Sequence, residues 1–286
     1  MTNIKYFLQF ILIFVLFSLY KIIGLKAASY ISAVLFKTLG PIFRSKKIIH
    51  ANISKAFPNL NEFEKNKIIN EMWSNYGKIF AEYMFIKEFR NGKFSKKITI
   101  ENQKILEKIK NDSSPVIFIS GHFNNFELMA MHIEKSGIQL SAIYRPLNNK
   151  FLNPLMEGIR VQYICKNQIK KGSSGTRKLL SNFKNGQSVA LMIDQRVSEG
   201  IKSKFFDNPA LTTTIPAQFV KKFKTKIVPI YIERLKNDNF NIKIHNPINF
   251  SENETLDTIT LRLNKILEKM ILHNPNQWIW THNRWK

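Results

Sequence analysis

The central part of the chain alternates between short apolar segments and amphipathic segments, and this alternation restricts the fold class more than any other feature. Residues 116–120 (VIFIS) are typical of a buried strand, and residues 124–137 follow with helical apolar spacing. Strands that alternate with helices of this length predict an α/β fold, a mixed, mostly parallel sheet flanked by helices. We expect further strands at 138–144, 161–165, 188–194, 226–234 and 239–248, and further helices at 173–186, 213–223 and from the Ser251–Glu254 capping box to Asn274.

A long amphipathic helix is expected before this region. Asn61 followed by Glu64 is a variant of the capping box that begins helices. From Ile69 to Tyr83 the apolar and aromatic residues keep the i, i+3, i+4, i+7 spacing of one helix face. This stripe predicts core packing and carries no candidate for catalysis.

The N-terminal 44 residues predict a membrane anchor with a juxtamembrane amphipathic segment, and residues 45–286 predict one globular domain. Residues 6–20 carry no charge, and with the apolar residues just beyond Lys21 the run reaches the roughly 20 residues that a spanning helix needs. No small-residue cleavage site follows, which favours an uncleaved anchor over a signal peptide. One basic residue precedes the run and seven follow before the first acid, Glu62, so we expect a single pass with the domain in the cytoplasm.

The charge balance predicts an anionic partner. The chain has 44 Lys and Arg against 20 Asp and Glu, a formal net charge of +24. Acidic lipid headgroups, phosphorylated substrates, an acidic carrier protein and nucleic acid all fit such a surface. Cys165 is the only cysteine, which excludes an internal disulfide, and no Cys/His cluster has metal-ligand spacing. We expect Cys165 to be a buried strand residue.

The first candidate for chemistry lies where the strand 116–120 ends. Reacting residues in open α/β sheets sit at the carboxyl ends of strands. Gly121 permits a sharp turn there, and His122 follows it, with Glu127 in the first turn of the next helix. A carboxylate on one ring nitrogen of a histidine fixes the tautomer and leaves the other nitrogen as a general base. The spacing therefore predicts that Glu127 orients His122.

The segment GHFNNFE at 121–127 resembles the G-H-x-x-N-x-E signature of the lipid A late acyltransferases, a variant of the His-x4-acid motif of glycerolipid acyltransferases. Further segments over residues 50–286 resemble family blocks in the same order. One stretch departs from the family, since SEGIKSKFF at 198–206 replaces a glycine-rich segment. The other matching blocks are AFPNLNEFEK (56–65), IYRPLNN (143–149), IRVQYI (159–164), residues 175–195, FFDNPALTTT (205–214) and QWIWTHNRWK (277–286).

This resemblance implies a glycerolipid-acyltransferase-like fold and an enzyme of the inner membrane. It implies a fatty acyl chain moved from acyl-(acyl carrier protein) to a hydroxyl of an anionic lipid A precursor of the Kdo2-lipid IVA type. His122 and Glu127 would be the catalytic pair, and no metal, organic cofactor or nucleic acid is implied. The residues expected to shape the substrate site are Arg145, Arg160, Arg177, Asp194 and Gln195.

Several alternatives stay open at this point. Asp194 is also compatible with holding an arginine or capping a turn. The acceptor could be another glycerophospholipid, glycolipid or aminolipid. The +24 charge also permits a nucleic-acid-binding protein or a membrane scaffold, although no nucleic-acid-binding signature is present. The tryptophans of the C-terminal segment fit a membrane interface, base stacking or core packing equally well.

Overall fold

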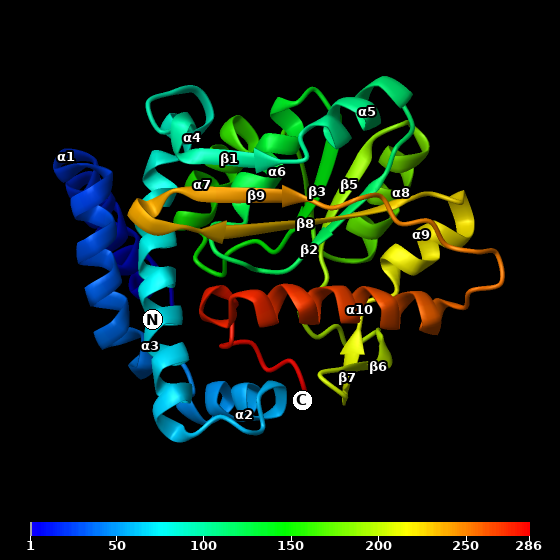
Figure 1. Ribbon diagram of the computed structural model, residues 1–286. Helices are drawn as coiled ribbons and strands as arrows, with labels where there is room; N and C mark the ends of the chain where they lie inside the picture. The colour runs from blue at the N-terminus through cyan, green and yellow to red at the C-terminus, as the bar shows by residue number, and fades with distance from the viewer. Residues whose placement is uncertain (1) are drawn as a thin grey trace.

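The computed structural model describes residues 2–286 and contains a seven-stranded sheet flanked by helices (Figure 1). The strand order is β1-β9-β8-β2-β5-β3-β4, in which β8, β2, β5, β3 and β4 run parallel and β9 runs antiparallel to β8. The predicted α/β class and the mostly parallel sheet are therefore confirmed. The strands are β1 Ile98–Glu101, β2 Ile117–Ser120, β3 Leu140–Tyr144, β4 Asn167–Lys170, β5 Ser188–Met192, β8 Ile227–Arg234 and β9 Phe240–Ile244, with a separate antiparallel hairpin of β6 Ile201–Phe205 and β7 Asn208–Thr212.

The helices follow most of the predicted pattern. Asn61 and Glu64 form the full capping box that begins the long helix α3, whose buried face includes Met72 and Trp73. The final helix α10 is capped by Thr255, four residues after the Ser251 that we expected as its cap. The α-helices are α1 Thr2–Phe43, α2 Lys46–Ala56, α3 Glu62–Glu82, α4 Ile86–Asn91, α5 Lys104–Asp112, α6 Glu127–Lys135, α7 Leu152–Tyr163, α8 Ser173–Lys184, α9 Ile215–Phe223 and α10 Leu256–His273.

Our prediction of a strand at 161–165 is wrong. These residues end α7 and enter the turn before β4, which begins at Asn167. The run VQYIC contains β-branched and aromatic residues, but Met156, Ile159 and Tyr163 keep helical spacing toward the core, and this longer-range packing decides the structure. Cys165 is buried as expected, although in the turn, where its thiol donates a hydrogen bond to the Leu140 carbonyl at 3.1 Å.

A sharp bend divides α1 at Gly24, which has a φ of 81° and a ψ of 165°. Phe17 before the bend and Phe36 after it both contact Phe80 of α3, with ring centroids 4.8 and 5.3 Å from it. Nineteen helical residues would extend about 28 Å if straight, so the chain must fold back at Gly24. Figure 1 shows α1 beside α3 at one end of the molecule. By length and apolar composition α1 is able to cross a membrane.

The parallel register of the central strands sets up one functional edge. Ser120 of β2 pairs with Met192 of β5, and β3 lies on the other side of β5. Residues that follow β2 and β5 therefore lie side by side, although the two strands are 72 positions apart in the chain. The chain leaves β2, β5 and β3 at this edge, and the segments that follow these strands begin at Gly121, Ile193 and Arg145.

Candidate active site

His122 is held by Asp194, which follows the neighbouring strand. The Nδ1 atom of His122 lies 2.8 Å from one oxygen of Asp194, and the backbone N–H of His122 donates to the other oxygen at 2.8 Å. A carboxylate only accepts hydrogen bonds, so the ring proton belongs on Nδ1. The other ring nitrogen, Nε2, has no hydrogen-bond partner among residues 2–286 and carries the free lone pair. The side chain of His122 is 20% exposed, so the ring is not sealed from solvent.

Our prediction that Glu127 orients His122 differs from this geometry. The carboxylate of Glu127 faces Arg160 of α7 and accepts hydrogen bonds from its Nε at 2.8 Å and its Nη2 at 2.6 Å. The physical reason is competition: a guanidinium offers two donors to one carboxylate, and the neighbouring strand already supplies His122 with Asp194. Glu127 stays in the site as the partner of Arg160.

The charges around His122 favour its protonated form. Burial would lower the pKa of the His122 imidazole, but the charge and hydrogen bond of Asp194 and the charge of Glu127 raise it above its ordinary value. For Asp194 the directions are reversed. Burial would raise its pKa, but the charge of His122 and the hydrogen bonds from His122 and Trp278 lower it to about 2. Asp194 is therefore ionised at physiological pH and can stabilise an imidazolium.

Trp278 completes the support of Asp194. Its indole N–H donates to the same oxygen that accepts from the His122 backbone, at 2.8 Å. Trp278 and Trp280 are buried against each other, with ring centroids 4.6 Å apart. Of the three interpretations of the C-terminal tryptophans, core packing is thus confirmed for these two. The tail adds a hydrogen bond that fixes the carboxylate beside the base.

Arg160 lies between two tyrosines as well as beside Glu127. Its guanidinium carbon is 6.0 Å from the ring centroid of Tyr83 and 5.7 Å from that of Tyr144, distances typical of cation–π contacts. Only 17% of the Arg160 side chain is exposed. Arg160 is therefore a positive charge held in a fixed position near His122. The negative charge of Glu127 balances it.

Of the other predicted site residues, the two arginines are exposed and Gln195 is half-buried. Arg145 directly follows β3 and Arg177 lies in the first half of α8, and both are exposed. Gln195 follows Asp194 and is half-buried. The structure therefore brings His122, Asp194, Glu127 and Arg160 together, whereas Arg145 and Arg177 belong to the rim.

A second buried ion pair holds the loop after β2 in place. Arg234 at the end of β8 pairs with Glu82 at the end of α3, whose side chain is 1% exposed. The guanidinium also donates to the Asn124 side chain at 3.1 Å, and Asn125 donates to Glu82 at 3.0 Å. Asn124 has a φ of 42°, a left-handed conformation that asparagine tolerates better than most residues. This network therefore fixes the path of the chain between His122 and Glu127.

Replacing Glu82 with alanine should destabilise the protein strongly, because it leaves the Arg234 charge buried without its partner. Removal of one member of a buried pair lowers the free energy of unfolding by about 3–5 kcal/mol. Denaturant unfolding followed by tryptophan fluorescence measures the change. Glu62→Ala at the start of the same helix removes an exposed partner of Lys65 and should change stability far less. Equal effects of the two substitutions would show that the buried network does not support the loop.

Sequence reasoning missed Glu82, Arg234 and the role of Trp278. The first two lie on separate elements, and nothing local pairs residues 152 positions apart. The sequence does carry a signal for Arg234, because this residue ends a predicted strand. It also carries one for the tryptophans, which stand in the largely polar segment 277–286. Neither signal identifies the partner.

The chain matches one family model over its whole length and known relatives over most of it. The family model described as bacterial lipid A biosynthesis acyltransferase matches residues 1–286. A lipid A biosynthesis acyltransferase of Haemophilus influenzae is 23% identical over 251 residues, covering 85% of this chain and 78% of the relative. The Escherichia coli lipid A biosynthesis lauroyltransferase is 23% identical over 255 residues, covering 85% and 79%, and the myristoyltransferase of the same organism is 22% identical over 247 residues, covering 85% and 75%. The residues around His122 thus lie in an enzyme that transfers acyl groups, and the chain belongs to the bacterial lipid A biosynthesis acyltransferase family.

Proposed function

We propose that this acyltransferase moves a fatty acyl chain from acyl-(acyl carrier protein) to a hydroxyl of a Kdo2-lipid IVA-type lipid A precursor. Residues 45–286 carry out the catalysis at the cytoplasmic face of the inner membrane, and residues 1–44 attach the enzyme to that membrane. The observation that carries the proposal is the His122 imidazole, whose Nδ1 proton is held by Asp194 while Nε2 is left free. This arrangement suits proton removal from an alcohol.

The reaction needs no nucleophile from the enzyme. His122 Nε2 accepts the proton of the acceptor hydroxyl as its oxygen attacks the thioester carbonyl. The tetrahedral intermediate then expels the carrier thiolate. The imidazolium gives its proton to this thiolate, so the products are an ester and a free thiol. The ionised Asp194 stabilises the imidazolium between these steps. Cys165 is unsuited to attack the donor, because burial raises the pKa of its thiol to about 12.

The arginines divide between internal support and substrate contact. The fork of Arg160 is occupied by Glu127, so its charge acts at a distance on the oxyanion that develops on the thioester. Arg145 and Arg177 are exposed at the same edge and can take phosphate or carboxylate groups of the acceptor in bidentate fashion. Gln195 directly follows Asp194 in the chain and offers a neutral hydrogen-bonding group.

The donor assignment rests on charge. A basic surface attracts an acidic carrier protein and raises its association rate, and the attraction weakens as salt increases. The net charge of +24 supplies such a surface even though part of it faces anionic lipid. Acyl-coenzyme A is also anionic, but it offers a basic surface fewer charges than an acidic carrier protein does.

The proposal is tested with purified full-length enzyme, one acyl-(acyl carrier protein) and Kdo2-lipid IVA as acceptor. Mass spectrometry should show the acceptor gaining the mass of one acyl chain, with free carrier thiol formed in equal amount. A lysophosphatidate acceptor and an acyl-coenzyme A donor run in parallel. Preferred transfer to lysophosphatidate would reject the lipid A acceptor, and equal rates with coenzyme A would reject the carrier-protein donor.

A further inference from the structure

The N-terminal half of α1 contacts the rest of the protein along its whole length. Its residues that are shielded from solvent recur every three or four positions from Tyr6 to Gly24, which is the spacing of one helix face. Near the N-terminal end, the Tyr6 carbonyl accepts a hydrogen bond from Asn149 at 2.8 Å, and the ring of Phe10 lies 6.4 Å from that of Phe151. Near the bend, Lys21 pairs with Glu88 of α4 at 2.6 Å. Contacts at residues 6 and 21 therefore fix both ends of a segment about 22 Å long.

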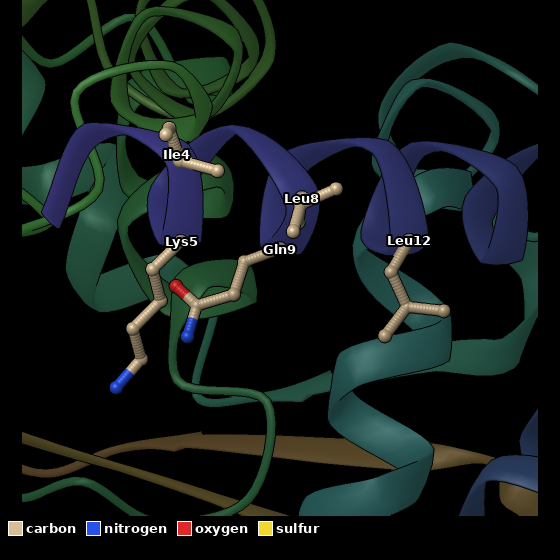
Figure 2. A pocket seen from close by; sticks show the side chains of 5 residues that line it. All are labelled: Ile4, Lys5, Leu8, Gln9 and Leu12. Carbon is tan, nitrogen blue, oxygen red and sulfur yellow. The ribbon is translucent and has the colours of Figure 1, made fainter. Parts of the chain in front are cut away.

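The opposite face of α1 is apolar and exposed. Among residues 2–286, 22 large hydrophobic side chains are exposed, and 16 of them belong to α1. Ile4, Leu8 and Leu12, with Lys5 and Gln9, line an open hollow of about 530 Å³ along the helix (Figure 2). Contiguous apolar surface of this extent marks a contact with another protein or with a membrane, and the high hydropathy of α1 favours the membrane.

These contacts are incompatible with a helix that crosses the bilayer by itself. A crossing helix would carry Tyr6 through a hydrocarbon core about 30 Å thick, away from the domain that Lys21 contacts. Asn149 and Phe151 hold Tyr6 and Phe10 beside that domain, in a loop that also contains the exposed Lys150. Irregular backbone and an exposed ammonium are both costly in lipid hydrocarbon.

We propose that α1 lies in the plane of the membrane, so that its N-terminus stays on the same side as the catalytic domain. The exposed face of the bent helix enters the boundary between headgroups and acyl chains, and the contacts at Tyr6 and Lys21 hold the domain against the surface. The occupant of this face is an anionic lipid surface, because residues 1–61 contain eight basic residues and no acid. This arrangement replaces the single pass expected from the sequence and holds whichever lipid is acylated.

The orientation has a consequence for the substrate. Asn149 and Phe151 belong to the loop that follows β3, and β3 ends at the same edge of the sheet as His122 and Asp194. A helix that holds this loop at the membrane brings the acceptor-binding edge to the lipid surface. An acyl-chain hydroxyl then reaches the base without the lipid leaving the bilayer.

Cysteine labelling tests the topology, because the only native cysteine is buried. In a Cys165→Ser background, Asn3→Cys and Lys286→Cys are each introduced at exposed positions near the two ends of the chain. A membrane-impermeant maleimide is applied to intact spheroplasts and to inverted membrane vesicles, with detergent-opened samples as the measure of full reactivity. We expect both cysteines to react in the same preparation. Reaction of the two cysteines in opposite preparations would overturn the proposal and restore a spanning helix.

Cross-linking in native membranes tests the docking independently. In the same background, Tyr6→Cys with Asn149→Cys is treated with a short bismaleimide and analysed by mass spectrometry of the digested chain. The matched control pairs Ile22→Cys with Asn149→Cys, which places the helix cysteine about 24 Å further along α1. We expect an intramolecular cross-link for the first pair and none for the control. Absence of the first cross-link, or equal yields for both pairs, would show that α1 is not docked in the membrane.

Discussion

Replacing His122 with alanine is expected to lower kcat for acyl transfer by about 10²–10⁴-fold, the usual contribution of a general base. An alcohol is a poor nucleophile at neutral pH, so its proton must leave as it attacks the thioester. Asp194 holds the His122 ring in the tautomer that carries its proton on Nδ1, so Nε2 is free to act as the base. The KM for the lipid acceptor should change little, because the exposed arginines and the membrane provide most of the binding. Initial rates with purified variant and wild-type enzyme measure both constants.

The structure provides a control for this substitution. His132 is also mostly shielded from solvent, and it lies in the adjacent helix α6, but away from Asp194. His132→Ala should therefore keep most of the activity, and similar melting temperatures for both variants would exclude unfolding as the cause of the loss. A His122→Ala enzyme with wild-type kcat would contradict the mechanism, as would an acyl group trapped on Cys165 or a serine.

The class of fold was predictable because its signals are local. A buried strand with four consecutive apolar residues and a helix with a capping box each depend on neighbours in the chain. The segment 161–165 shows where this fails. Its composition favours a strand, but packing of α7 against the core outweighed the preference of those few residues.

The site was predictable only in part, for a similar reason. Gly121 and His122 could be found because a strand end and a turn residue adjoin them in the sequence. The choice of Glu127 as the partner of His122 rested on closeness in the chain, whereas the bond to Asp194 depends on the β2–β5 register. A parallel sheet brings the ends of non-consecutive strands together, and a single sequence does not specify which strands are neighbours.

The shape of α1 was likewise not visible in its composition. Hydropathy measures whether a segment tolerates lipid, and residues 6–25 do. It does not measure whether one face of the helix is already occupied by protein. The stripe from Tyr6 to Gly24 has the same apolar character as the exposed face, so only the tertiary contacts distinguish a docked helix from a free one.

Asp194→Asn is expected to lower kcat by up to about 10⁴-fold, the loss seen when the equivalent carboxylate is changed in Ser-His-Asp enzymes. An asparagine amide can donate to Nδ1, which moves the ring proton to Nε2 and removes the free base. The remaining activity should also respond differently to pH. The base must be neutral, so activity falls as pH drops through the pKa of His122, which Asp194 raises above its ordinary value. Loss of the Asp194 charge lowers that pKa, and the acidic limb of the kcat/KM profile should move to lower pH.

Glu127→Gln provides the comparison that distinguishes the two carboxylates. The charge of Glu127 also raises the pKa of His122, but as a smaller cause than Asp194 and without a hydrogen bond to the ring. Its substitution should therefore shift the acidic limb in the same direction by less and lower kcat by less. In the double variant His122→Ala with Asp194→Asn, kcat should be no lower than in His122→Ala alone, because the carboxylate contributes to proton transfer through the imidazole. If Glu127→Gln instead gave the larger loss and the larger shift, Glu127 would be the partner that orients the base during turnover, and Asp194 would serve mainly to hold the C-terminal tail through Trp278.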